Sequence, residues 1–304
     1  MNYTWLRSFH AVAAEGGFTA ASRLLNVGQP TITSQVKALE GYFSVELFHR
    51  RGRGVTLTEA GVDLFAITRR FMSLEDEARD LLNAYGGFHA GRLKVGAVGP
   101  YHATEMLSAF HETYPDVRLT VTVGNSKEMV QRLLDYEVDV GVLAHVEDDP
   151  RILAMPYSRH PIVVFVHKRH HFSGRKTIRI EELQGERMVL RETGSTTRLA
   201  FEVALAEAGV TIEPVMEIGS REAVWLAVAR GIGFGVVSDI EYIPHPDLRV
   251  VRIFDAKVFT TAHVNCLNER KDDRLIGAFF QVCEHLLNQR PHLDTLDVRT
   301  AAPE

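Results

Sequence analysis

The sequence has few of the features that mark secreted, membrane-bound or metal-stabilised proteins. It contains two cysteines in 304 residues, too few for a disulfide scaffold, and a chain of this length buries enough apolar surface to fold without such links. Its longest apolar runs, 162–166 and 231–237, are far shorter than the roughly 18 residues that cross a bilayer. The first residues have no apolar core behind a basic patch. We therefore expect a globular, cytoplasmic protein with no membrane contact.

The usual signatures of catalysis and cofactor binding are also missing. There is no G-x-S-x-G motif or P-loop, and the glycines within 231–235 precede an apolar strand instead of following one. His167, His170 and His171 are the densest of the 14 histidines, but they lie among basic residues without a neighbouring carboxylate, which favours a solvated loop over a metal site. We expect Cys266 and Cys283 in the core. The sequence predicts no catalytic residue, no metal site and no cofactor.

The net charge of −5 conceals an uneven distribution. Residues 1–58 carry six basic and three acidic groups, a balance of +3, whereas the other 246 residues carry 28 basic and 36 acidic groups, a balance of −8. A small basic segment on an acidic protein indicates where a nucleic acid would bind.

Three helices are predicted in this basic segment. Apolar residues at helical spacing give the first helix an inward face, and Gly16-Gly17 ends it. Thr19 is placed to cap the second helix, which ends at 26–28. Gln29-Pro30 opens the third helix, because a proline in the first turn loses no hydrogen bond. The expected core residues are Leu6, Phe9, Val12 and Ala13, then Ala21, Leu24 and Leu25, and finally Ile32, Val36 and Leu39.

The outer face of the third helix is suited to DNA. It presents short or flexible hydrogen-bonding groups with a single charge, whereas a merely solvated face typically mixes glutamate and lysine. Such groups contact bases and phosphates when the second helix of a helix-turn-helix enters the major groove. Residues 48–57 then predict a hairpin wing whose arginines can neutralise phosphates. The residues concerned are Gln29, Thr31, Thr33, Ser34 and Lys37 on the helix and Arg50, Arg51 and Arg53 on the wing.

A long helix is predicted over residues 59–85, with Thr58 as its N-cap. Its apolar residues recur with spacings of three and four, the pattern of a heptad seam that packs against a partner helix. A second copy of the chain as partner would pair two DNA-binding heads, as an operator with two half-sites requires. The seam comprises Leu64, Ile67, Phe71, Leu74, Ala78, Leu81 and Tyr85. Gly86-Gly87 and Gly91 then indicate a hinge.

Residues 92–304 alternate apolar strands with helices, which predicts α/β lobes built on parallel, doubly wound sheets. We expect two similar lobes with a cleft between them. Lobe I comprises about 92–162 and 266–304, and lobe II about 163–265. The predicted domains are therefore 1–58, a winged helix-turn-helix; 59–87, a dimerisation helix; and 92–304, an effector domain.

The chain resembles the LysR-type transcriptional regulators. The resemblance is carried by the ungapped stretch 18–40, followed by Glu46-Leu47-Phe48, Arg50, Arg53, Val55, Leu57-Thr58 and Ala60-Gly61. It implies an α + α/β protein with a winged helix-turn-helix, a long linker helix and a two-lobed effector domain like a periplasmic binding protein. Two positions depart from the family pattern, Gly28 where serine is usual and Ser34 where many members carry a charge.

The resemblance also implies residue roles and partners. Gln29, Pro30, Thr31, Thr33 and Ser34 would approach bases or nearby phosphates, and Arg50 and Arg53 would belong to the wing. The expected partners are promoter DNA, RNA polymerase, a small effector and further copies of the chain in a dimer of dimers, a homotetramer. A solute-binding protein without DNA activity, or an enzyme acting on a small anion, is the alternative. The solute-binding protein would leave the first 58 residues without a role.

Four predicted helix N-termini meet at the cleft, and free N–H groups at helix N-termini favour anions. Each alone is typical of an ordinary helix cap, but together they indicate an anion with several oxygens. The candidate effector-binding residues are Tyr101, His102, Thr104, Asn125, Ser126, Ser195, Thr196, Arg198, Ser220 and Arg221.

Segments 100–102, 124–126, 190–192, 194–195 and 218–224 resemble the LysR subgroup associated with 2-aminoethylphosphonate breakdown. That resemblance implies a zwitterionic effector, whose ammonium group needs a carboxylate. Glu192 and Asp239 are the candidates for this carboxylate.

Overall fold

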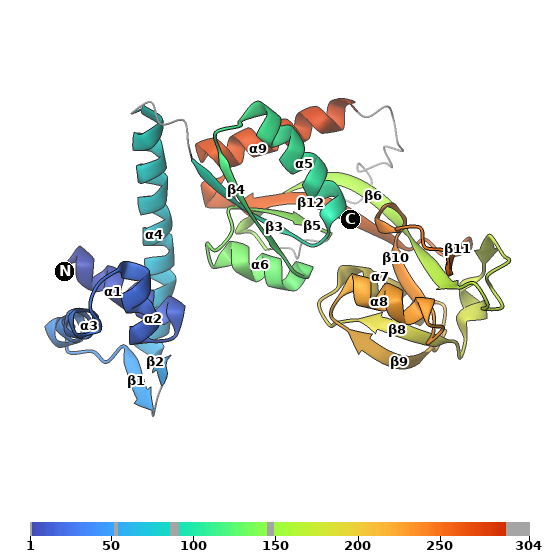
Figure 1. Cartoon of the computed structure of the whole chain (residues 1–304), viewed down its shortest axis with the longest axis horizontal. Coiled ribbons are helices and arrows are strands. Elements are labelled where there is room, and N and C mark those ends of the chain that lie inside the picture. Colours follow the sequence, from blue (N-terminus) through green and yellow to red (C-terminus); the bar gives the residue numbers. More distant parts are fainter. Residues whose placement is uncertain (1, 52–53, 86–90, 145–148, 290–304) are drawn as a thin grey trace, which may run out of the picture. The chain divides into compact units, whose positions relative to one another are not determined.

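The computed structural model describes residues 2–51, 54–85, 91–144 and 149–289 (Figure 1). Contacts divide the chain into two compact units, Met1–Ala90 and Gly91–Glu304, each with its own hydrophobic core. Among the described residues no helix combines the length and apolar character that crossing a membrane requires. Arg53, the predicted hinge at Gly86-Gly87 and the 290–304 part of lobe I lie outside the described residues.

The first unit begins with the three predicted helices, α1 (Tyr3–Glu15), α2 (Phe18–Leu25) and α3 (Gln29–Phe43). They are followed by β1 (Phe48–Arg51) and β2 (Gly54–Leu57), which pair antiparallel as the wing. The prediction that Thr19 caps α2 is wrong, because the helix begins at Phe18 with Gly17 as N-cap. Thr19 Oγ1 instead donates to Gln29 Oε1 at 3.4 Å, linking α2 to the start of α3.

The core of this unit confirms the predicted helix faces with one exception. Phe9, Val12, Ile32 and Val36 are completely buried, and they form one cluster with Leu47 and Phe48 of the wing segment. Leu24 was expected inside but is 60% exposed. In the short helix α2, Ala21 and Leu25 already fill the space against the neighbouring helices.

The long helix α4 (Glu59–Tyr85) begins as predicted, because Gly61 N donates to Thr58 Oγ1 at 3.0 Å. Its first turns pack on the rest of the unit through Leu64 and Phe65. Beyond them the predicted seam is exposed in the single chain: Ile67 by 64%, Phe71 by 43%, Leu74 by 62% and Leu81 by 49%.

The second unit contains two α/β lobes (Figure 1). In lobe I, the parallel strands β3 (Arg92–Ala97), β4 (Arg118–Val123) and β5 (Val140–Leu143) lie in the order β4-β3-β5. Helices α5 (Pro100–Thr113) and α9 (Arg274–Gln289) share one core cluster on this sheet, and α6 (Ser126–Leu134) contributes to another.

Lobe II contains β7 (Thr177–Ile178), β8 (Arg187–Arg191), β9 (Glu213–Ile218), β10 (Gly235–Ser238) and β11 (Leu248–Ile253). Strands β8 and β9 are parallel, and α7 (Thr196–Glu207) and α8 (Arg221–Ala229) follow them. Short 3-10 turns complete the chain, η1 (Ile180–Leu183) and η2 (Asp239–Glu241) in this lobe and η3 (Asn268–Arg270) before α9.

Two long strands connect the lobes, β6 (Ile152–His167) and β12 (Phe259–Leu267). They pair antiparallel, and β6 continues into lobe II, where it pairs with β10 and β11. The strand predicted at 162–166 is therefore only the second half of β6. The eight-stranded sheet is mixed, not purely parallel as predicted, because both connecting strands run against their neighbours. The β8–β9 pair is parallel, as predicted.

Candidate functional site

The outer face of α3 is available to a ligand within its unit. Gln29, Pro30, Thr31, Ser34 and Lys37 are exposed, whereas the opposite face forms the core. Thr33 is half-buried. The predicted DNA-contacting side chains of the helix thus lie on the open side of a helix-turn-helix.

The wing is fixed to α3 by a residue that the sequence did not single out. The Glu40 carboxylate accepts from Leu47 N at 2.9 Å, just before β1, and Thr58 Oγ1 donates to Glu46 O at 2.7 Å, just after β2. The first bond ties the start of the hairpin to α3, and the second ties the end of the hairpin to its start. The backbone of Arg50 lies in β1, while Arg53 is outside the described residues.

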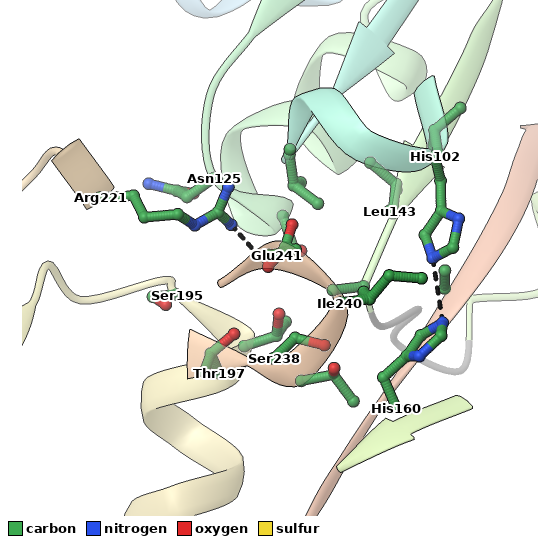
Figure 2. Close-up of a pocket in the computed structure, with 18 of the residues that line it drawn as sticks. His102, Asn125, Leu143, His160, Ser195, Thr197, Arg221, Ser238, Ile240 and Glu241 are labelled. Atoms are coloured by element: carbon green, nitrogen blue, oxygen red, sulfur yellow. Dashed lines mark hydrogen bonds and ion pairs between the residues drawn. The ribbon is translucent and has the colours of Figure 1, made fainter. Parts of the chain in front are cut away.

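A pocket between the lobes of the second unit is lined from both sides (Figure 2). It encloses about 600 Å³ of empty space, including its solvent-filled mouth. The ends of β3 and β4 bring Gly99, His102, Asn125 and Ser126 to it from lobe I, and lobe II brings Arg191, Ser195, Thr197, Arg221 and Glu241. Figure 2 shows the labelled members of this set, among them His102, Asn125, Ser195, Arg221 and Glu241, around the pocket.

Two of the helix N-termini at this pocket have side-chain caps. Asn125 accepts from Glu128 N at 3.0 Å in a capping box on α6, and Ser195 accepts from Arg198 N at 3.4 Å on α7. Ser126 is different. Its side chain is buried against the pocket, with 5% of the residue exposed, and its hydroxyl has no hydrogen-bond partner among the described residues. A buried polar group without a partner is a place for a ligand oxygen.

An ion pair crosses the pocket wall. Arg221 Nη2 lies 3.0 Å from Glu241 Oε2, and both side chains are largely buried (Figure 2). Burial raises the pKa of Glu241, and the charges of Arg221 and Arg191 oppose that rise. The carboxylate packs against the α carbon of Gly99, where an added Cβ would overlap it. Glu241 of lobe II thus sits at the N-terminus of α5 in lobe I.

The second arginine of the pocket already has a partner. Arg191 Nε and Nη2 donate to the two oxygens of Glu192 at 2.7 and 2.9 Å. Burial tends to raise the pKa of Glu192, but the hydrogen bonds from Arg191 outweigh it and hold that pKa below its ordinary value. Glu192 is therefore committed to Arg191 and does not line the pocket.

Two imidazoles meet at the far end of the pocket. His102 Nε2 lies 3.2 Å from His160 Nε2 (Figure 2), and His160 Nδ1 lies 3.5 Å from Asp239 Oδ1. One ring nitrogen of the close pair must donate and the other accept. Asp239 does not line the pocket, which makes Glu241 the one carboxylate among the described lining residues.

The structure brings six of the ten predicted effector residues to the pocket, His102, Asn125, Ser126, Ser195, Thr196 and Arg221. Tyr101, Thr104 and Ser220 do not line it, and neither does Arg198. The Arg198 guanidinium donates to Glu202, Glu217 and the carbonyl of Arg191 instead. It lines a neighbouring groove with Ser126, Ser195 and Thr196.

Several lining residues were not predicted from the sequence, because they do not lie at the start of a helix, where a sequence pattern is recognisable. Arg191 ends a strand, Glu241 lies in a 3-10 turn, and His160 lies within β6. Thr197, which lies at the same helix start as Ser195 and Thr196, also lines the pocket, as do Ser238 and Thr260, which no sequence pattern indicated.

A winged helix-turn-helix, a long helix with an exposed apolar seam and a two-lobed domain with a polar pocket together define a ligand-responsive DNA-binding regulator. Comparison with known proteins agrees. Residues 3–62 match the model of the bacterial regulatory helix-turn-helix protein, lysR family, and residues 86–287 match the LysR substrate binding domain. The chain belongs to the LysR family of transcriptional regulators, whose members are regulators and not enzymes.

Three similar proteins illustrate the range of the family. The RuBisCO operon transcriptional regulator of Allochromatium vinosum is 32% identical over 235 residues, covering 77% of this chain and 78% of that protein. Full-length CbnR complexed with its target DNA is 26% identical with a TM-score of 0.68, covering 94% and 99%. The CcmR regulatory domain of Synechocystis PCC6803 in complex with 2-PG is 23% identical with a TM-score of 0.61, covering 66% and 99%.

Proposed function

We propose that this regulator binds promoter DNA as a dimer and that a compact zwitterionic anion between its lobes controls it. The proposed domains are 1–58 for DNA binding, 59–87 for dimerisation and 92–304 for the effector. Two dimers form a tetramer that contacts RNA polymerase in the cytoplasm, where promoter DNA lies. The DNA contacts are made by Gln29, Pro30, Thr31, Thr33, Ser34, Lys37, Arg50 and Arg53.

The exposed seam of α4 supports a second copy as partner. Leu74 and Ile67 are more than half exposed, and a row of such side chains at heptad spacing is stabilised when a matching row covers it. Two identical helices provide such a row through a twofold axis.

The polar lining of the pocket supports the proposal that one end of the effector is an anion. The buried, unpartnered Ser126 hydroxyl lies at the N-terminus of α6, and Ser195 and Thr196 lie at the N-terminus of α7. Backbone N–H groups and hydroxyls at two helix N-termini are suited to an oxygen-rich group such as a phosphonate. This convergence is the observation that carries the proposal.

The position of Glu241 supports the proposal that the other end of the effector carries a positive charge. Glu241 is the one carboxylate among the described lining residues, so an ammonium group of the effector would be placed against it. Arg221 is already neutralised by the same carboxylate at 3.0 Å, so the pair adds no net charge to attract a simple anion. A small aminophosphonate matches both ends, and 2-aminoethylphosphonate is the first candidate. The ligand 2-PG, present in the complex of the similar CcmR domain, is the competing candidate.

Calorimetric titration of the full chain with matched ligands tests the proposal. We expect 2-aminoethylphosphonate to bind more tightly than ethylphosphonate, which lacks the ammonium group, and more tightly than 2-PG. Ser126→Ala weakens every phosphonate because it removes the unpartnered hydroxyl. Glu241→Gln weakens 2-aminoethylphosphonate by about 10- to 100-fold, the range for losing a charged hydrogen bond, but not ethylphosphonate.

Thr104→Ala is the matched control, because this exposed residue of α5 does not line the pocket. The aminophosphonate assignment fails if ethylphosphonate and 2-aminoethylphosphonate bind equally. The pocket assignment itself fails if Ser126→Ala and Thr104→Ala give the same affinities as the wild type for every ligand that binds.

A further inference from the structure

Two histidines and a glutamate meet in lobe II, away from the effector pocket. His170 Nε2 lies 3.4 Å from Glu186 Oε2, and His171 Nε2 lies 3.4 Å from Glu186 Oε1. One ligand atom from each of the three residues can be chosen so that all lie within 4.8 Å of one another. We infer that His170, His171 and Glu186 form a binding site for a divalent transition-metal ion such as zinc.

The sequence argued against a metal here because no carboxylate lies near these histidines along the chain. In the structure, the turn after η1 brings the Glu186 carboxylate against both imidazoles, so a carboxylate is available to the histidines after all. His167, the third histidine of the basic segment, is not part of the cluster. Two imidazoles and one carboxylate, with a fourth position for water, are a ligand set that zinc commonly takes.

The spacing of the donor atoms fits such an ion. Zinc binds imidazole nitrogen at about 2.0–2.1 Å and carboxylate oxygen at about 2.0–2.2 Å, so neighbouring ligand atoms of a tetrahedron lie about 3.3 Å apart. Both nitrogen–oxygen distances in the cluster are 3.4 Å. The imidazoles face different oxygens of one carboxylate, so an ion between them can reach either oxygen.

The backbone holds these side chains in place before any ion arrives. His170 N donates to His167 O at 2.8 Å and Ser173 N donates to His170 O at 2.9 Å. The buried Phe172 ring packs on His171, with 4.0 Å between ring centroids. On the other side, Glu213 N donates to Glu186 O at 2.8 Å. Ordered turns lower the entropy cost of assembling the ligands.

The hydrogen bonds of the imidazoles and the ion pairs of the neighbouring basic side chains are compatible with a bound cation. Coordination through Nε2 leaves the ring proton on Nδ1, so the long 3.3 Å hydrogen bond from Phe172 N to His170 Nδ1 opens on binding. The nearby Lys168 is paired with Asp247 at 2.7 Å and Arg175 is paired with Glu182.

The site is separate from the effector pocket. His160 of the pocket and His167 at the end of β6 are seven residues apart on one strand, which at about 3.3 Å per residue is roughly 20 Å. The His171 side chain is 60% exposed, so an ion can enter from solvent without passing the effector.

The test uses tag-free full-length protein that has been freed of metal with a chelator. We expect equilibrium dialysis against Zn²⁺ to show one ion bound per chain in the wild type. The dissociation constant for Zn²⁺ should be at least tenfold higher in His171→Gln and in Glu186→Gln. Co²⁺ should give an intense visible absorption spectrum in the wild type and a weak one in Glu186→Gln, because few-coordinate cobalt absorbs strongly. Millimolar Mg²⁺, which prefers oxygen ligands, should not compete.

His111→Gln is the matched control, because His111 is an exposed histidine of α5 outside the cluster. Both test substitutions preserve folding, since His171 is exposed and glutamine keeps the volume of Glu186; far-UV circular dichroism checks this. The site is refuted if the wild type binds no stoichiometric Zn²⁺, or if His171→Gln and Glu186→Gln bind it as tightly as His111→Gln.

Discussion

Acid should weaken the first unit through one half-buried histidine. His10 of α1 lies against α4, with Nδ1 3.1 Å from Thr68 Oγ1 and its ring centroid 5.2 Å from that of Phe65. Thr68 Oγ1 also lies 3.1 Å from Phe65 O, to which it donates, so His10 Nδ1–H is the donor to Thr68. Burial, with a smaller effect from the charge of Arg69, lowers the pKa of His10 from 6.5 to about 4.

The sign and size of the effect follow from this shift. Between pH 6.5 and 4 the unfolded chain binds a proton at His10 that the folded chain does not, so the free energy of unfolding falls as pH falls. By pH 5 the loss is about 2 kcal/mol. The measurement is urea unfolding of the wild type and of His10→Asn, which keeps a donor near the Nδ1 position, at pH 7.5 and pH 5.

His10→Asn should be about 2 kcal/mol less sensitive to this pH change than the wild type, because the other histidines contribute equally to both proteins. Equal pH dependence in the two proteins would refute the burial argument. If the wild type gains stability relative to the variant at pH 5, folding raises the pKa of His10 instead of lowering it, and His10 is charged in the folded unit.

Three further predictions concern the other parts of the molecule. Leu74→Glu, placed in the α4 seam, should convert dimers to monomers in light-scattering measurements, whereas Ala66→Glu off the seam should not; equal masses would contradict the seam. Lys37→Gln should reduce the slope of log affinity for promoter DNA against log salt by about one, and unchanged slopes would remove Lys37 from the phosphate contacts. Gly99→Ala should weaken 2-aminoethylphosphonate binding in calorimetry, because its Cβ overlaps the Glu241 carboxylate; an unchanged affinity would contradict a role for that packing.

Local patterns in the sequence predicted the helices of the DNA-binding unit well. Ile32, Val36 and Leu39 recur at helical spacing, and all three are buried, because the periodicity of a short helix directly records which face is inside. Leu24 broke the pattern because neighbouring helices decide how much of α2 is covered. The continuity of β6 was also missed, since its first half contains exposed and polar residues that do not read as a buried strand.

The polar groups of the sites were predictable only where they start a helix. Asn125 and Ser195 are caps, and caps are visible as local sequence signals. Glu241 and Glu186 lie in turns, and their partners Arg221 and His170 are 20 and 16 residues away along the chain. Nothing in local spacing links such residues, because the fold of lobe II creates their contacts.

The paired strands β6 and β12 also determine how the lobes can move. Their ladder is regular on both sides of one irregularity, where the register changes between Ala262 and His263 and Tyr157 of β6 is left without an opposite residue. An extra residue in a ladder concentrates bending at that point. Any displacement of one lobe relative to the other would therefore bend the β6–β12 ladder first at Tyr157, and the remaining pairs on either side would keep their register.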